Sequence, residues 1–133
     1  MASIFSKIVA GEIPCHKIAE NDFCIAFLDI QPLATGHVLV VPKQETDYIF
    51  DLEPNQYAEL MLFASDIAKA LGKAIPCKRV GMAVIGLEVP HAHVHLIPLQ
   101  TIGDINFSKS KMKVSDNDLA ETALLIRKQI MIS

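Results

Sequence analysis

The chain has no cluster of basic residues and no long apolar run. It contains 12 Lys and Arg against 15 Asp and Glu, and its formal net charge of −3 offers no general attraction for a polyanion. We therefore expect no nucleic-acid partner. The longest apolar runs, such as residues 37–41, are far too short to cross a bilayer, so we expect no membrane insertion. The N-terminus also lacks the charged-then-apolar pattern of a secretory signal.

Cysteine is scarce, and its spacing suggests no pairing. Cys15, Cys24 and Cys77 are odd in number and widely spaced, and no Cys-x-x-Cys pair occurs. This usage is typical of reduced thiols, and we expect a cytoplasmic protein.

The composition that is present predicts a folded globular protein. Apolar residues make up 51% of the chain and charged residues 20%, and 133 residues are enough to bury a core. No internal repeat or linker divides the sequence. We expect one domain spanning residues 1–133.

Hydrophobic periodicity predicts short strands and one long helix. Apolar residues at helical spacing indicate a short helix within residues 1–14 and a long amphipathic helix from Pro54 to about Ala74. Residues 101–113 are polar and predict a mobile loop, and Ser115 and Asp118 form a capping-box pattern that predicts a final helix. Strands are expected at residues 15–20, 23–29, 37–41, 79–85 and 91–98. The fold class is therefore α+β, an antiparallel sheet covered by helices.

The most informative stretch is His91-Ala92-His93-Val94-His95-Leu96-Ile97-Pro98. Three of the five histidines alternate here with apolar residues, which predicts a strand with the three imidazoles on one face and the apolar side chains in the core. Such a row spans roughly 13 Å, which suits a phosphate group with its substituents. Because imidazole titrates near neutrality, the row can supply a nucleophile, proton donors and cationic hydrogen bonds.

Two other interpretations of this row are open on the residues alone. The first is a surface strand that happens to carry histidines. The second is a metal site, since two histidines on a strand can bind zinc and His37 or Glu88 can fold in as a further ligand. A nucleophilic role requires a phosphorus electrophile, and a carbonyl or carboxylate that fixes the ring tautomer.

A family resemblance favours the nucleophilic interpretation. Residues 91–97 match the pattern His-φ-His-φ-His-φ-φ, in which φ is apolar, and three further segments resemble motifs of the same family in the same order: residues 4–14, residues 26–30 and residues 36–43. The chain thus resembles the histidine triad (HIT) family, and most closely its nucleoside-phosphoramidase-like branch. The resemblance implies a HIT-like fold, which is a five-stranded antiparallel sheet with one long helix and short terminal helices.

The resemblance also implies roles for individual residues. His93 would attack the α-phosphorus of a purine-type nucleotide and form a nucleotidyl-histidine intermediate, which water would hydrolyse to a nucleoside monophosphate. His95 would bind phosphate oxygens, and His91 and His37 would orient the row. Asp29 would accept hydrogen bonds from the ribose hydroxyls, although a turn-forming role is an alternative. The base pocket would be walled by Phe27, Leu28, Ile30 and Ile8, with Ile4 or Phe5 nearby, or these apolar residues would simply belong to the core.

The chain departs from the family pattern at two places. Ser3 and Ser6 stand where some members carry zinc-binding cysteines, so we expect no structural zinc, no other metal and no cofactor. Glu88 lies where members commonly carry a phosphate-binding hydroxyl or amide. A carboxylate repels a phosphate unless it is neutralised, so Glu88 would relay a proton, bind a protonated His91 or be an exposed loop acid.

We therefore expect a metal-independent nucleotide hydrolase that works as a homodimer through the long helix and the fourth strand. The family implies the dimer, and the consecutive apolar residues Met61, Leu62 and Phe63 support it. A nucleotide-binding regulatory or scaffold protein with little catalysis is the alternative. A metal-binding protein that uses the histidines is a third hypothesis.

Overall fold

The computed structural model describes residues 2–132, so Met1 and Ser133, the ends of the expected domain, lie outside the described residues. Five strands form one sheet, in the spatial order β1-β2-β3-β5-β4, and every neighbouring pair is antiparallel. They are β1 (Lys17–Glu20), β2 (Cys24–Leu28), β3 (Val38–Pro42), β4 (Arg79–Ala83) and β5 (Val94–Leu99). The predicted α+β class and antiparallel sheet are confirmed.

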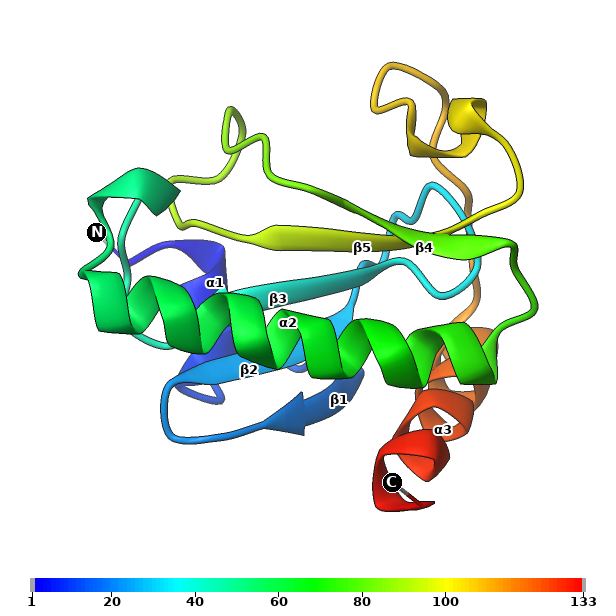
Figure 1. The fold of residues 1–133 in the computed structure, drawn as a ribbon, viewed down its shortest axis with the longest axis horizontal. Coiled ribbons are helices and arrows are strands. Elements are labelled where there is room, and N and C mark those ends of the chain that lie inside the picture. The colour runs from blue at the N-terminus through cyan, green and yellow to red at the C-terminus, as the bar shows by residue number, and fades with distance from the viewer. Residues whose placement is uncertain (1, 133) are drawn as a thin grey trace.

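Three helices cover the two faces of this sheet. They are α1 (Ile4–Val9), α2 (Pro54–Ala74) and α3 (Asp116–Ile132), and short 3-10 turns occur at Ile49–Asp51 and Ile102–Ile105. Figure 1 shows α2 lying along the sheet, with α1 on the far side. The side chains of β2 alternate accordingly: Cys24, Ala26 and Leu28 join the core under α2 and α3, whereas Ile25 and Phe27 join a smaller cluster with Phe5 of α1.

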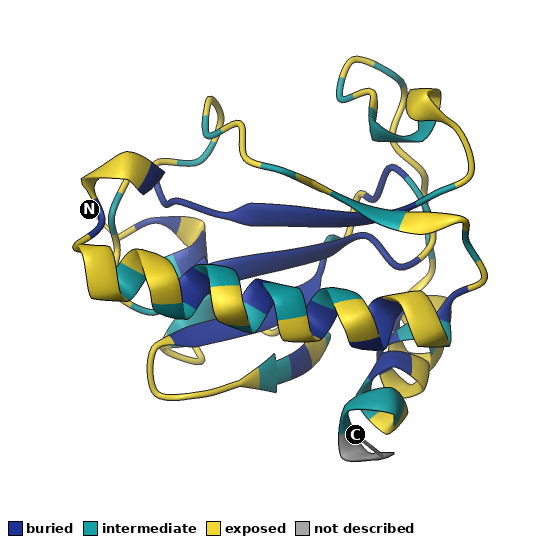
Figure 2. Ribbon diagram, in the orientation of Figure 1, coloured by how far each residue is buried: buried dark blue, intermediate teal, exposed yellow. Residues whose placement is uncertain are grey.

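The long helix begins and ends where local sequence chemistry places its termini. Pro54 occupies the first turn, where its missing N–H breaks no intrahelical bond, and the Glu53 N–H donates to Oε1 of Gln56 at 3.3 Å. Pro76 follows two residues after Ala74 and cannot continue the helix. Figure 2 shows buried and exposed residues alternating along α2, while β3 and the whole of β5 except its last residue are buried. The predicted bounds of this helix are confirmed.

The bounds of the predicted strands differ from the structure by up to three residues. The histidine strand begins at Val94 rather than at His91, because the N–H groups of His91 and Ala92 donate to the Val89 and Thr46 carbonyls at 2.8 and 2.7 Å, outside the sheet. Pro42 belongs to β3, so this strand ends one residue later than predicted. The final helix that the capping-box pattern predicts is present as α3, which has 17 residues and begins at Asp116, directly after Ser115.

No helix within residues 2–132 combines the length and the apolar character that crossing a membrane would need.

Candidate functional site

Four histidines gather at the face of the sheet that carries α1. His37 directly precedes β3, His91 and His93 precede β5, and His95 lies within it, while Ala92, Val94 and Leu96 pack into the core under α2 as predicted. The exposed fractions of the four histidines are only 2%, 0%, 7% and 8%. The interpretation of the row as an exposed surface strand is therefore wrong.

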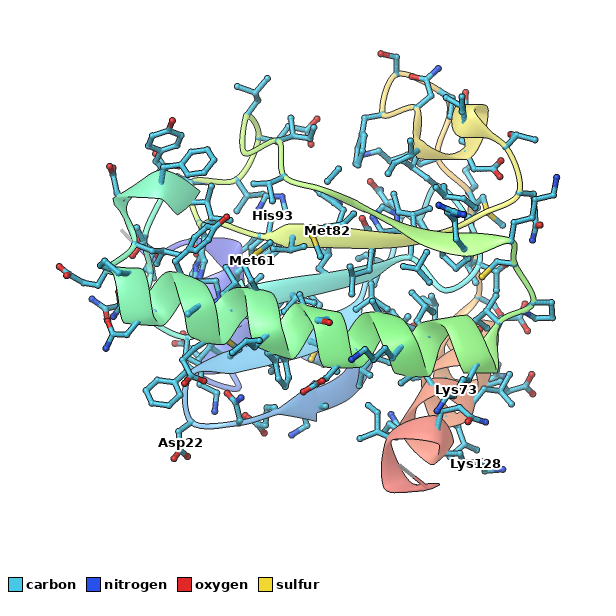
Figure 3. The ribbon with its side chains drawn as sticks, in the orientation of Figure 1. Asp22, Met61, Lys73, Met82, His93 and Lys128 are labelled. Carbon is cyan, nitrogen blue, oxygen red and sulfur yellow. The ribbon has the colours of Figure 1, made fainter. Side chains whose placement is uncertain are left out.

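The ring of His93 is held so that one nitrogen stays unbonded. Its Nδ1 lies 2.8 Å from the carbonyl oxygen of His91 and must carry the proton, since a carbonyl only accepts. Phe5 contacts the ring edge-on at a centroid distance of 5.0 Å, and His95 does so at 4.8 Å. Figure 3 labels His93 where the chain enters β5. In this tautomer Nε2 holds a free lone pair, which a nucleophile requires.

His37 and His95 form a directed hydrogen-bond chain. The Leu33 N–H donates to His37 Nδ1 at 3.0 Å, so in the neutral ring the proton is on Nε2. That Nε2 lies 3.0 Å from His95 Nδ1 and donates to it. The proton of neutral His95 is consequently on Nε2, where it is available to an external acceptor.

The unbonded Nε2 atoms of His93 and His95 reach the surface of the protein. Within residues 2–132, no fully buried side-chain nitrogen or oxygen lacks a hydrogen-bond partner. Neither Nε2 has such a partner, so neither is fully buried. One lone pair and one N–H donor thus face outward from adjacent rings, which suits a group with an electrophilic centre and an anionic oxygen.

Burial keeps the histidines beside His93 neutral. It lowers the pKa of His37 to about 4 and that of His95 to about 3, with nearby positive charge as the smaller cause, and it lowers the pKa of His91 as well. The expectation of cationic hydrogen bonds from these three rings is therefore wrong. They act as neutral donors and acceptors at neutral pH.

His91 does not contact Glu88. Its Nε2 donates to the Pro42 carbonyl at 2.8 Å, and its Nδ1 lies 2.8 Å from Oγ of Ser3. Glu88 is exposed in the segment between β4 and β5, and no hydrogen bond or ion pair to it is found in the described part of the chain. The hypothesis that Glu88 binds a protonated His91 is wrong, because both ring nitrogens are engaged elsewhere.

Asp29 lies at the end of β2 beside His37. Its Oδ1 accepts from the Gln31 N–H at 2.9 Å, as in a turn, and its Oδ2 lies 3.7 Å from His37 Nε2. Burial raises the pKa of Asp29 and outweighs the Gln31 hydrogen bond and the positive charge of Lys111, which lower it. Asp29 therefore stabilises the turn after β2 through Oδ1, as the alternative interpretation proposed. Its Oδ2 lies on the side of the histidines.

The four apolar residues expected around a base do not share one face. Phe27 is buried beside Phe5 at a centroid distance of 5.7 Å, and Ile8 packs against the same cluster. Ile30 is 65% exposed in the loop after β2. Leu28 packs under α2 instead, because it alternates with Phe27 along the strand, so its side chain belongs to the core.

Several residues near the histidines were not predicted from the sequence. Phe107 contacts His95 edge-on at a centroid distance of 4.6 Å and His37 at 6.3 Å, and the charge of Lys111 acts on both rings. Ser3 and Glu45 lie around His91. Phe107 and Lys111 belong to the predicted polar loop, and no periodic pattern marks them. Ser3 stands at a position where some family members carry a zinc-binding cysteine, but the sequence did not predict its contact with His91.

One cluster has the residue types of a metal site. The ligand atoms of Asp29, His37 and His95 lie within 4.8 Å of one another. The proton positions oppose binding, however, because a histidine that binds a metal through Nε2 carries its proton on Nδ1. At His37 the Leu33 N–H already points at Nδ1. A cation would therefore have to displace the Nε2 proton and break the bond to His95.

A groove lies on the side of the sheet that carries α2 and α3. This groove of about 460 Å³ is formed by β1, α2 and α3, with Glu20, Asp66, Lys69 and Lys73 among its lining residues. Figure 3 labels Lys73 near the C-terminal end of α2. No histidine lines the groove, so it is separate from the site described above.

Comparisons with known proteins agree with this geometry. A family model described as the HIT domain matches residues 10–102. The adenosine 5'-monophosphoramidase of Schizosaccharomyces pombe is 36% identical over 99 residues, which cover 74% of this chain and 74% of that protein. The adenosine 5'-monophosphoramidase of Saccharomyces cerevisiae is 39% identical over 102 residues, covering 73% of this chain and 62% of the yeast protein.

A solved structure extends the similarity to the fold. The crystal structure of a HIT-like protein from Bartonella henselae, described as involved in cell-cycle regulation, superimposes with a TM-score of 0.83 at 30% identity. The alignment covers 96% of this chain and 95% of that one.

Proposed function

The chain belongs to the histidine triad family, and on that premise we propose that it hydrolyses nucleotides at the α-phosphate and releases a nucleoside monophosphate. The two yeast relatives are named as adenosine 5'-monophosphoramidases, which supports a purine nucleotide with an amine leaving group as the substrate. The family was expected from the sequence motifs, and the domain match supports it.

The observation that carries this proposal is the 2.8 Å hydrogen bond from His93 Nδ1 to the His91 carbonyl, which leaves Nε2 as an outward-facing lone pair. In the first step, Nε2 attacks the α-phosphorus, a P–N bond forms to the ring, and the leaving group departs with the bonding pair and takes up a proton from solvent. In the second step, water attacks the phosphorus and gives a proton back to solvent, the bonding pair of the P–N bond returns to His93 Nε2, and the monophosphate leaves.

His95 and His37 support this chemistry as neutral rings. His95 donates from Nε2–H to a phosphoryl oxygen. His37 fixes this tautomer by donating its own Nε2–H to Nδ1 of His95. Asp29 accepts from the ribose hydroxyls, and the base lies against the apolar side chains Phe27, Ile30 and Ile8. Each step uses only side chains and water, so turnover should persist in the presence of a chelator.

The test is turnover of an adenosine phosphoramidate by the wild type and by His93→Ala. We expect the variant to lose turnover by at least about 10⁴-fold while it still binds adenosine monophosphate, because the nucleophile is gone and the pocket remains. His16→Ala is the matched control, since His16 pairs with Asp116 away from the site. Normal turnover in His93→Ala would rule out the mechanism.

A second candidate function is nucleotide binding with little catalysis. The negative charge of Glu88 acts on Asp29, although more weakly than the other causes of its pKa shift, and a carboxylate near the site would repel a phosphate. If the wild type binds adenosine monophosphate without turnover, this candidate is preferred. Glu88→Gln then separates repulsion by the carboxylate from a missing phosphate donor, because the amide keeps the size and removes the charge.

A metal-binding function is tested by elemental analysis of protein purified without chelators. Stoichiometric zinc would contradict the proposal, and the Asp29, His37 and His95 cluster is where we would look for it.

We propose further that the chain forms a homodimer through α2 and β4 and is one cytoplasmic domain. β4 is an edge strand with Met82 43% exposed, and Leu62 of α2 is 65% exposed. Cys15, Cys24 and Cys77 are all free thiols, which supports a reducing compartment.

A further inference from the structure

The first histidine of the triad is joined to the N-terminal segment of the chain. His91 is completely buried, and its Nε2 donates to the Pro42 carbonyl at 2.8 Å. In the neutral ring, Nδ1 must therefore accept a hydrogen bond. The atom nearest to it is Oγ of Ser3 at 2.8 Å, and Ser3 lies 88 residues away in sequence.

The hydroxyl of Ser3 is itself fixed in place. Ser3 is the N-cap of α1, and its Oγ accepts from the Ser6 N–H at 3.0 Å. Its backbone N–H donates to Oε1 of Glu45 at 2.7 Å, and the Ser6 hydroxyl donates to the same oxygen at 2.6 Å. In Figure 1, α1 and the segment that follows β3 are at the same end of the molecule. Glu45 is also a hydrogen-bond partner of the Ser3 side chain. Ser6 Oγ is farther from His91 Nδ1, at 3.4 Å, and donates to Glu45, so the Ser3 hydroxyl is the donor nearest to that nitrogen.

The same histidine supplies the acceptor that orients His93. The carbonyl of His91 receives Nδ1–H of His93 at 2.8 Å. Phe5 of α1 contacts both rings edge-on, at 5.8 Å to His91 and 5.0 Å to His93. A shift of the His91 ring would thus move the acceptor, and with it the lone pair that the reaction uses.

We propose that Ser3, held by Glu45, is a positioning residue for His93, acting through the ring and the carbonyl of His91. We call Ser3, Ser6 and Glu45 the N-terminal clamp. The clamp touches neither substrate nor the reacting atoms, and its part in turnover rests on the proposed function. The clamp would act on the fraction of molecules in which the His93 ring is in the Nδ1–H tautomer and its Nε2 lone pair faces the phosphorus.

The kinetic test compares Ser3→Ala, Ser3→Thr and Glu45→Ala with the wild type on an adenosine phosphoramidate. Ser3→Ala should lower kcat about tenfold, which corresponds to about 1.4 kcal/mol, and change KM by less than about twofold. Ser3→Thr, which keeps the hydroxyl, should restore most of kcat, and Glu45→Ala should give a smaller loss. Ser65→Ala on α2 is the matched control for removing a serine hydroxyl.

A second measurement does not depend on turnover. Long-range ¹H–¹⁵N correlation of the imidazoles should show His93 in the Nδ1–H tautomer in the wild type. In Ser3→Ala the other tautomer should gain population, or Nδ1–H should exchange faster with water. A wild type without turnover would overturn the proposed function, and the tautomer comparison would still test the clamp.

Three results would overturn the proposal. The first is an unchanged kcat together with an unchanged His93 tautomer in Ser3→Ala. The second is a folded Ser3→Thr that is as slow as Ser3→Ala. The third is a loss of kcat in Ser3→Ala that matches the loss of folded protein on thermal unfolding, which would leave Ser3 as a helix cap only.

Discussion

At the scale of single residues, the four histidines of the site are distinguished by what their nitrogens contact. His37 receives the Leu33 N–H and donates to His95, so both rings are neutral and directed. His93 instead donates to a carbonyl and keeps its second nitrogen free. Two neighbouring histidines therefore have different roles: His95 is a fixed hydrogen-bond donor and His93 is a nucleophile. The difference arises because backbone groups near the rings set their tautomers.

The neutrality of His37 and His95 predicts how stability depends on pH. Their pKa values are about 4 and about 3 in the folded protein, against about 6.5 in an unfolded chain. Below pH 6.5 the unfolded state therefore binds more protons. The free energy of unfolding should be unaffected by these rings above that pH. It should fall as the pH drops from about 6.5 to about 4, by about 1.4 kcal/mol per pH unit for each ring.

Urea unfolding between pH 4.5 and 7.5 measures this slope. In His37→Asn the free energy of unfolding should depend less steeply on pH than in the wild type, because about one proton fewer is taken up on unfolding. His16→Asn is the control, since His16 is a partly exposed histidine. Equal slopes in His37→Asn and the wild type would contradict neutral burial of His37.

The neutral state of these rings was not predictable from the sequence. The alternation of histidine with apolar residues correctly placed Val94 and Leu96 in the core. It carried no information on Leu33, whose N–H sets the tautomer of His37, because that contact depends on how the loop after β2 folds back. A titrating residue can be located from sequence, whereas its protonation depends on tertiary burial.

At the scale of secondary-structure elements, the segment after β5 contacts the histidines and the loop between β2 and β3. Phe107 packs on His95 and His37, and the Met112 N–H donates to the Pro32 carbonyl at 2.8 Å. The sequence predicted only a polar loop here. Its contact with the histidines follows from a single aromatic side chain, which no periodic pattern distinguishes.

Replacement of Phe107 by alanine should raise the pKa of His95. Burial is the largest cause of the low pKa of about 3, and removing the ring lets water reach the imidazole and stabilise its charged form. The pKa should move toward 6.5, and NMR titration of the imidazole measures it directly. Phe23→Ala, in the exposed turn before β2, should leave this titration unchanged. An unchanged pKa of His95 in Phe107→Ala would mean that β5 and α1 exclude water from this imidazole without Phe107.

The elements themselves were predicted most accurately where their signals are local. Helix α2 was located by Pro54, Pro76 and the 3.6-residue period between them, all of which lie within or beside the helix. The start of β5 was placed three residues too early, because the Ala92 N–H donates to Thr46, which no local pattern indicates.

At the scale of the whole molecule, the sheet ends in an unprotected edge. β4 pairs with β5 on one side only, and its other side has no strand beside it within the described residues. Met82 of β4 and Leu62 of α2 both expose apolar surface, and Figure 3 labels Met82 on β4 and Met61 on α2. An unpaired edge beside apolar side chains is a typical surface for association of two copies.

This surface predicts that Met82→Asp is monomeric and the wild type dimeric. Light scattering of the wild type should give twice the chain mass of 14.6 kDa, and the variant should give that mass once, because a carboxylate at the edge strand must be desolvated on pairing. Leu124→Asp is the control, since Leu124 exposes a similar apolar fraction, 46% against 43%, on α3. Circular dichroism establishes that both variants are folded. A wild type with a single-chain mass would exclude the dimer. A dimeric Met82→Asp would place the contact on another surface, and the Leu62 face of α2 would be substituted next.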